Sequence, residues 1–127
     1  MTEVLKYNHV ESKLIVIRNQ KALLDYDVAE LYGVETKRVN EAVKKNPNKF
    51  PYGYVFELGN EEWNSLRSEF STLNENEESG RGQHSKYAPK AFTEKGLYML
   101  ATILKSKKAT ETTIEIIETF TKIRNLT

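Results

Sequence analysis

The sequence predicts a small single-domain α+β protein with a helix–turn–helix core, β-hairpins of the winged-helix kind and two C-terminal helices. Its 127 residues suit one domain, and 39% of them are hydrophobic, which is enough for a modest core. Short β-branched runs alternate with runs of helical spacing, and no repeat or linker divides them. We therefore expect one domain over residues 1–127, in this order: a hairpin over 13–24, a helix–turn–helix over 25–46, a strand–helix–strand insert over 50–92 and helices over 93–125.

The N-terminal hairpin is predicted by two apolar runs on either side of Asn19-Gln20, which read as a turn. Residues 13–18 are rich in β-branched side chains, and residues 21–24 can return beside them. Asp25 and Asp27 follow directly. We expect them to cap the first helix, because a carboxylate can accept the unpaired backbone N–H groups of a helix N-terminus.

The helix–turn–helix is predicted by a small residue where two helices cross and a glycine at the turn between them. Ala29 is the small residue, and Gly33 follows four positions later. Apolar side chains fill the expected inward positions: Val28, Tyr32, Val34, Val39 and Ala42. The same pattern also fits an ordinary pair of packed helices with a solvated outer face.

Local charge favours a DNA-binding role for the second helix, although the whole chain has a net charge of only +1. Residues 37–49 contain five cations and one Glu, a net charge of +4. Residues 57–78 contain seven Glu and one Arg, a net charge of −6, and residues 81–95 contain four cations and one Glu, a net charge of +3. Binding of a polyanion depends on such local distributions and not on the total charge.

We predict a recognition helix over residues 35–46 that enters the major groove of double-stranded DNA. The side chains expected to reach base edges are Thr36, Lys37, Asn40 and Lys44. Asn40 suits adenine and Lys37 suits guanine by hydrogen-bond geometry. Phosphate contacts are expected from the other basic residues: Arg38, Lys45, Lys49, Arg81, His84 and Lys86.

The insert is predicted to hold a strand over residues 52–58, a helix over residues 61–70 capped by Asn60, and a second strand over residues 86–92. We place the second strand at a sheet edge because Pro89 cannot donate to a central ladder. The strand pair corresponds to the hairpin that a winged-helix protein places beside its recognition helix. The glycine-flanked basic residues of its turn could contact a phosphate or the minor groove, or could form only a solvated bend.

The C-terminal segment is predicted to form two helices, the first of them capped by Thr93. That helix carries an apolar stripe: Leu97, Leu100, Ala101 and Leu104. β-Branched residues make the last segment resemble a strand, but its length and a second stripe favour a helix: Ala109, Thr113, Ile116, Ile117, Phe120 and Ile123. This stripe could form a homodimer seam, which would set two recognition helices about one DNA turn apart, or it could pack on the preceding helix.

Four motifs occur in order over residues 10–124: the run over 23–40, Phe50-Pro51, the run Gly80-Arg81-Gly82-Gln83-His84 ahead of Lys86-Tyr87, and Ala91-Phe92-Thr93-Glu94 with Gly96. Together they resemble the KilA-N-related ORF-six N-terminal (ORF-N type) DNA-binding domain family of phages and bacteria. The resemblance implies a small α+β domain that binds DNA, is linked to phage regulation or antirepression, and has no catalytic activity.

No enzyme site emerges from the residues. The chain has no cysteine, which excludes disulfides, thiol nucleophiles and Cys-ligated metals. His9 and His84 stand alone without metal-ligand spacing, and there is no Gly-rich phosphate loop. We expect no catalytic residue, metal, cofactor or small-molecule substrate. No apolar run approaches the ~20 residues that span a bilayer, so we expect a cytoplasmic protein of a bacterial cell or a phage-infected host.

The sequence therefore favours a sequence-selective DNA-binding domain of a phage- or prophage-type regulator. The alternative is an antirepressor-like interaction module. Such a module would bind a repressor or host protein through its acidic segment, residues 57–78, or through its C-terminal helix.

Overall fold

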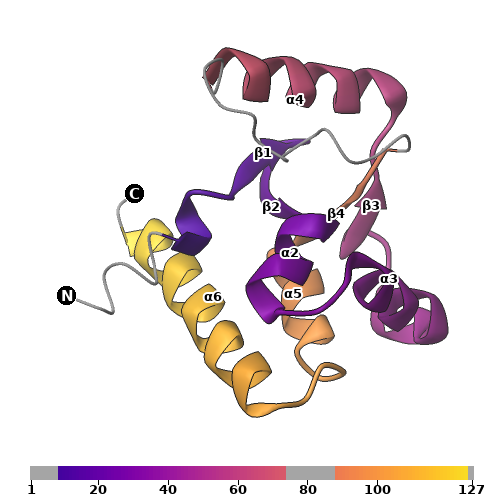
Figure 1. Cartoon of the computed structure of the whole chain (residues 1–127), viewed down its shortest axis with the longest axis vertical. Helices are drawn as coiled ribbons and strands as arrows, with labels where there is room; N and C mark the ends of the chain where they lie inside the picture. The colour runs from indigo at the N-terminus through magenta and orange to yellow at the C-terminus, as the bar shows by residue number, and fades with distance from the viewer. Residues whose placement is uncertain (1–8, 74–87, 126–127) are drawn as a thin grey trace.

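The computed structural model describes residues 9–73 and 88–125, in which a four-stranded antiparallel sheet has helices on both faces (Figure 1). The strands are β1 (Ile15–Ile17), β2 (Gln20–Leu24), β3 (Val55–Glu57) and β4 (Lys90–Thr93), in the order β1-β2-β4-β3. The helices are α2 (Asp25–Tyr32), α3 (Thr36–Lys45), the 3-10 helix η1 (Pro47–Lys49), α4 (Asn60–Leu73), α5 (Glu94–Leu100) and α6 (Lys107–Asn125). The predicted α+β class is confirmed.

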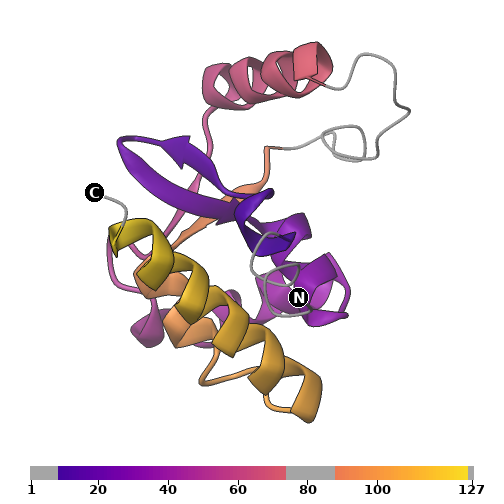
Figure 2. The same ribbon diagram turned by 90° about the vertical axis from the view of Figure 1, so that its left-hand side faces the viewer.

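The two faces of the sheet belong to two separate apolar cores. Leu23 and Phe92, which are paired in the β2–β4 register, belong to the larger core with α2, α3, α5 and α6. Their neighbours Leu24 and Ala91, also a register pair, belong to the smaller core with α4. This alternation follows from the two-residue period of a strand. Figure 2 shows α4 on one side of the sheet and α6 on the other.

The predicted N-terminal hairpin is confirmed, with β1 and β2 paired antiparallel. Arg18 and Asn19 form its turn with φ of 51° and 64°, one residue before the predicted Asn19-Gln20, because Gln20 already pairs with Ile17. Two consecutive positive φ values suit the right-handed twist of a two-residue hairpin, and asparagine tolerates this region better than most residues.

The prediction that the strand ending at residue 92 lies at a sheet edge is wrong. β4 is an inner strand, bonded to β2 on one side and β3 on the other. Pro89 lies just before β4, where its carbonyl accepts a hydrogen bond from the Leu58 N–H at 3.3 Å. The proline lacks only its own donor, so the ladder of the following residues is intact.

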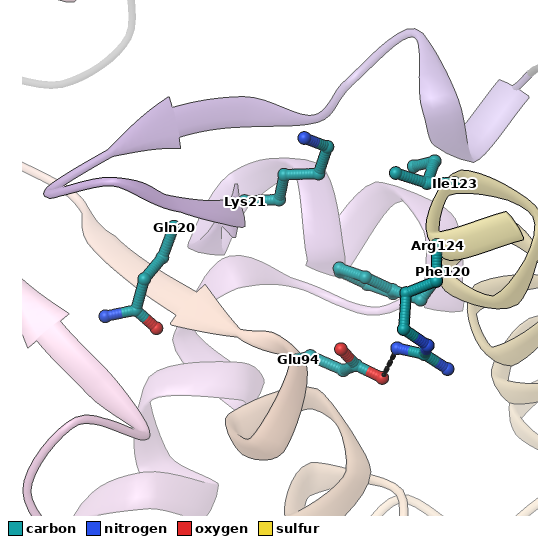
Figure 3. A pocket seen from close by; sticks show the side chains of 6 residues that line it. All are labelled: Gln20, Lys21, Glu94, Phe120, Ile123 and Arg124. Carbon is teal, nitrogen blue, oxygen red and sulfur yellow. Dashed lines mark hydrogen bonds and ion pairs between the residues drawn. The ribbon is translucent and has the colours of Figure 1, made fainter. Parts of the chain in front are cut away.

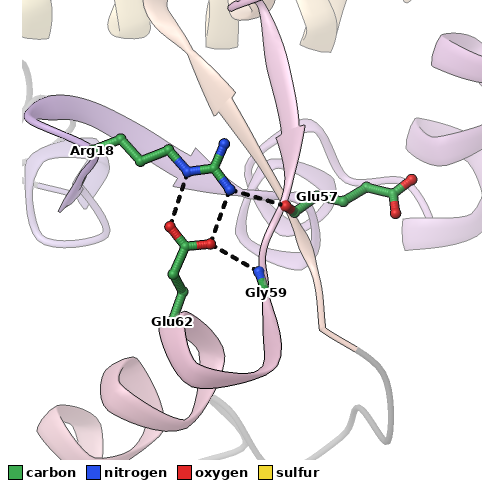
Figure 4. A network of polar contacts seen from close by, with 4 residues as sticks. All are labelled: Arg18, Glu57, Gly59 and Glu62. Carbon is green, nitrogen blue, oxygen red and sulfur yellow. Dashed lines mark hydrogen bonds and ion pairs between the residues drawn. The ribbon is translucent and has the colours of Figure 1, made fainter.

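α4 is held to the sheet by a polar network as well as by its apolar face (Figure 4). It begins at Asn60, so Asn60 is not the predicted cap; instead the Glu62 carboxylate accepts the Gly59 N–H at 2.8 Å. Arg18 donates to both oxygens of Glu62, at 2.9 and 3.0 Å, and lies 4.5 Å above the centre of the Phe56 ring. The hairpin turn, β3 and the start of α4 are thereby joined.

The predicted cap of α5 is confirmed, because the Thr93 hydroxyl accepts the Gly96 N–H at 3.4 Å. The same hydroxyl is 3.0 Å from the carbonyl oxygen of Tyr54, to which it donates. A Cβ at Gly96 would lie 2.0 Å from that carbonyl oxygen, so the helix can approach the backbone before β3 only with glycine at this position.

The last segment is a helix, as its length and apolar stripe predicted. Ile116 and Phe120 are buried in the larger core, so the centre of the stripe packs within the chain. Thr112 also donates to the Leu31 carbonyl at 3.0 Å, which fixes α6 against α2. Ile114 and Ile117 remain exposed on the outer side.

Gly96→Ala should destabilise the fold by about 1–3 kcal/mol or more, because the new methyl group must displace backbone. Gly59→Ala is the matched control, since a Cβ there meets only the Glu62 side chain at 3.6 Å and the loss should stay below about 1 kcal/mol. Urea unfolding monitored through Trp63 measures both. Equal losses in the two variants would contradict the close-approach argument.

The Arg18–Glu62 pair should make stability depend on pH. Hydrogen bonds from Arg18 and then from Gly59 lower the pKa of Glu62 from 4.5 to about 2. Because the folded-state pKa is depressed, the stabilisation is complete above pH 4.5 and is lost as the pH falls towards 2. Urea unfolding of wild type and Arg18→Ala should give a stability gap at pH 7 that narrows by pH 2. Arg67→Ala serves as the control, and a gap for Arg18→Ala that stays constant with pH would refute the assignment.

Candidate nucleic-acid interface

The helix pair α2–α3 is built around the tight turn that the sequence pattern predicted. Gly33 ends α2 with φ 71° and ψ 34°, a left-handed conformation that glycine adopts without strain. The Gly33 and Val34 N–H groups donate to the carbonyls of Glu30 and Ala29 at 3.1 and 3.0 Å. Five positions that the pattern predicted for the contact between the helices are buried: Val28, Ala29, Tyr32, Val39 and Ala42.

Contrary to prediction, neither aspartate is the N-cap residue of α2; both lie in its first turn. Leu24 occupies the N-cap position, and no side chain caps the helix there. Asp25 and Asp27 are both buried, and Asp27 lies 3.7 Å from the Lys13 ammonium. Both carboxylates face the protein interior, because the chain turns directly from β2 into α2.

Asp25 joins α3 to the sheet through a single oxygen. Its Oδ2 accepts the side-chain amide of Asn40 at 3.1 Å and the backbone N–H of Lys90 at 3.2 Å. Asn40 lies in the middle of α3, and Lys90 is the first residue of β4. One buried carboxylate therefore sets the position of α3 relative to β4.

Asn40 is predicted to project outward, but its side-chain amide is turned towards Asp25. It is half-buried, and its Oδ1 is buried with no hydrogen-bond partner among the described residues. The predicted adenine contact stays a prediction, and it requires the amide to turn away from Asp25.

The basic residues of α3 are free to meet an anion. Four of them are exposed, and in residues 9–73 and 88–125 none forms an ion pair: Lys37, Arg38, Lys44 and Lys45. Four basic residues elsewhere on the body pair with carboxylates: Lys13 with Glu30, Arg18 with Glu62, Lys122 with Glu11 and Arg124 with Glu94. The outer face of α3 therefore carries an excess of positive charge, since Glu41 is the one acidic residue of this helix.

Two other predicted contact residues lie near the ends of α3. Thr36 is its first residue and is half-buried. Lys49, in η1, is also half-buried and donates to the Thr102 hydroxyl at 3.0 Å. Three predicted phosphate contacts, Arg81, His84 and Lys86, lie outside the described residues.

A concavity of about 450 Å³ lies between α3 and the place where the end of β3 pairs with the start of β4. Its lining comes from both sides: Lys37, Asn40, Glu41, Val43, Lys44, Glu57 and Lys90. Sequence reasoning did not select Lys90 as a contact, although it lies in the basic run over residues 81–95. Its proximity to α3 follows from the Asp25 bridge, which no local pattern shows.

A second concavity, of about 350 Å³, lies at the far end of α6 (Figure 3). Two of its three charged groups are paired with each other, with Arg124 donating to Glu94 at 2.6 Å. Tyr98 donates to the same carboxylate at 2.6 Å, and burial together with this bond raises the pKa of Tyr98 to about 12. This pocket therefore presents less unpaired charge than the α3 surface.

Within the described parts of the chain, no three His, Cys, Asp or Glu side chains gather in a way that could hold a metal ion. None of the helices described there combines the length and the apolar character that crossing a membrane requires.

Comparison with known proteins adds one finding. A family model described as the ORF6N domain matches residues 12–103. This is the family that the four sequence motifs resemble, so that prediction is confirmed. No curated protein and no solved structure matches the chain.

Replacing Asp25 should separate its hydrogen bonds from its charge. Asp25→Ala leaves the Lys90 N–H and the Asn40 amide unpaired and should lower stability by about 1–3 kcal/mol. Asp25→Asn can put its carbonyl oxygen in the place of Oδ2 and keep both bonds, so it should lose less. Urea unfolding measures both variants, and an Asp25→Asn loss as large as that of Asp25→Ala would show that the two bonds are not what matters.

Proposed function

The chain belongs to the ORF6N domain family, and on that premise we propose that it is a sequence-selective double-stranded DNA-binding domain of a phage-type regulatory protein. The observation that carries the proposal is the outer face of α3, where four exposed cations have no carboxylate partner among the described residues. Phosphates of a duplex supply the missing negative charge.

The dimensions of α3 suit insertion into the major groove. Its ten residues extend about 15 Å, and Val39 and Ala42 anchor one side in the core. The opposite side can then enter the groove as a recognition helix does. We assign base contacts to Thr36, Lys37 and Lys44, and phosphate contacts to the remaining cations: Arg38, Lys45 and Lys49.

Asn40 has a different role in this proposal. Its amide holds α3 against β4 through Asp25, so it sets the angle at which the helix is presented. A homodimer through α6 would use the exposed Ile114 and Ile117, since Ile116 and Phe120 are buried within the chain.

Fluorescence anisotropy with a random-sequence duplex at several salt concentrations tests this function. Wild type should bind with affinity that falls steeply with salt, because neutralised phosphates release counterions. Lys44→Gln/Lys45→Gln should weaken binding on every sequence and make the salt dependence shallower. Lys21→Gln/Lys122→Gln removes the same charge at the far end of α6 and should change binding little.

Two outcomes would contradict the proposal. Absence of wild-type binding even at low salt would favour the interaction-module alternative, in which a repressor or host protein is the partner. Equal weakening in both double variants would show that total charge, and not α3, governs binding.

A further inference from the structure

Three more lysines gather at the corner where α5 leads into α6, outside every contact assigned so far. Lys105, Lys107 and Lys108 lie within four residues of sequence, and all three are exposed. In the described part of the chain none of them pairs with a carboxylate. We call these three residues the α6 corner.

The positions of these lysines are electrostatically unfavourable for the protein alone. The start of a helix carries partial positive charge, which favours acidic side chains there and disfavours basic ones. The first turn of α6 nevertheless has no acidic residue. Ser106 caps the helix by accepting the Ala109 N–H at 3.0 Å, which gives this backbone donor a partner. The positive charge of the lysines and of the helix start still has no acidic residue beside it in the first turn. An anion from outside would relieve this repulsion.

The α6 corner is continuous with the proposed DNA-binding surface of α3. A Cβ on Gly33, in the turn before α3, would lie 3.6 Å from Cε of Lys108. Lys49, just after α3, bonds to Thr102 in the loop between α5 and α6. The first turn of α6 and the loop before it therefore lie close to the chain on both sides of α3.

We propose that the α6 corner binds the sugar–phosphate backbone of the same duplex that α3 enters. This inference rests on the proposed function and adds a second contact surface to it. Lysine ammonium groups are compact, mobile charges that suit phosphates without reading bases. The corner would therefore add affinity and fix the register of α3, while sequence selection stays with α3.

The test compares the full chain with Lys107→Gln/Lys108→Gln in the same anisotropy titrations over a range of salt. Glutamine has a helix propensity close to that of lysine, so the fold should persist, and thermal unfolding should show no loss of stability. If both lysines contact phosphates, the slope of log affinity against log salt should become shallower by about 1.8, because each contact contributes about 0.9. At about 0.1 M salt the affinity should fall on the order of tenfold or more.

Lys21→Gln/Lys122→Gln is the matched control, with the same change in charge at the far end of α6. The inference is overturned if the corner variant keeps the wild-type slope, or matches this control, while Lys44→Gln/Lys45→Gln loses binding. A wild type that binds no DNA at low salt overturns the proposed function itself, so the two failures are distinguishable.

Discussion

The arrangement of this domain depends on the point where β2 ends. There a side-chain oxygen of Asp25, and not a backbone carbonyl of β2, accepts the next N–H of β4. The last β2–β4 register pair is Leu24 with Ala91, after which the backbone turns into α2. The N–H of Lys90 would then lack a partner, and Oδ2 of Asp25 accepts it. Because the same oxygen accepts the amide of Asn40, the end of the strand ladder also becomes the point that positions α3. A buried acceptor with two donors tolerates little displacement of either element.

The two apolar cores hold different helices against the sheet. The larger core packs α2, α3, α5 and α6 against one face of the sheet, so the surfaces near α3 all rest on one apolar core. α4 belongs to the other core and is joined to the hairpin by the Arg18–Glu62 pair. Basic residues also fall into two groups, those with and those without a carboxylate partner. Four basic residues elsewhere on the body are held in ion pairs, whereas those of α3 and of the α6 corner have no carboxylate partner in the described parts of the chain.

Features of the fold were predicted correctly from the sequence where they depend only on neighbouring residues. The hairpin turn, the left-handed Gly33, the Thr93 cap and the helical last segment all follow from neighbouring residues. Predictions were wrong where the same residue type fits two different structural roles equally well. An aspartate at a helix start can cap that helix or accept bonds from distant elements, and Asp25 does the second. Likewise, a proline beside a strand does not say whether that strand lies at the edge, and β4 is an inner strand.

The sequence by itself determined the fold class, the family, the two-helix unit and the basic character of its second helix. These properties depend on residue type and on spacing over a few turns of chain. Only the tertiary structure decided that Asn40 turns inward, that Lys90 lies beside α3 and that the α6 corner adjoins the α2–α3 turn. Each of these contacts joins segments separated by strands or helices, and the energy of bringing them together comes from burial across the whole sheet. A local sequence pattern does not contain this information, so these contacts are visible only in the folded structure.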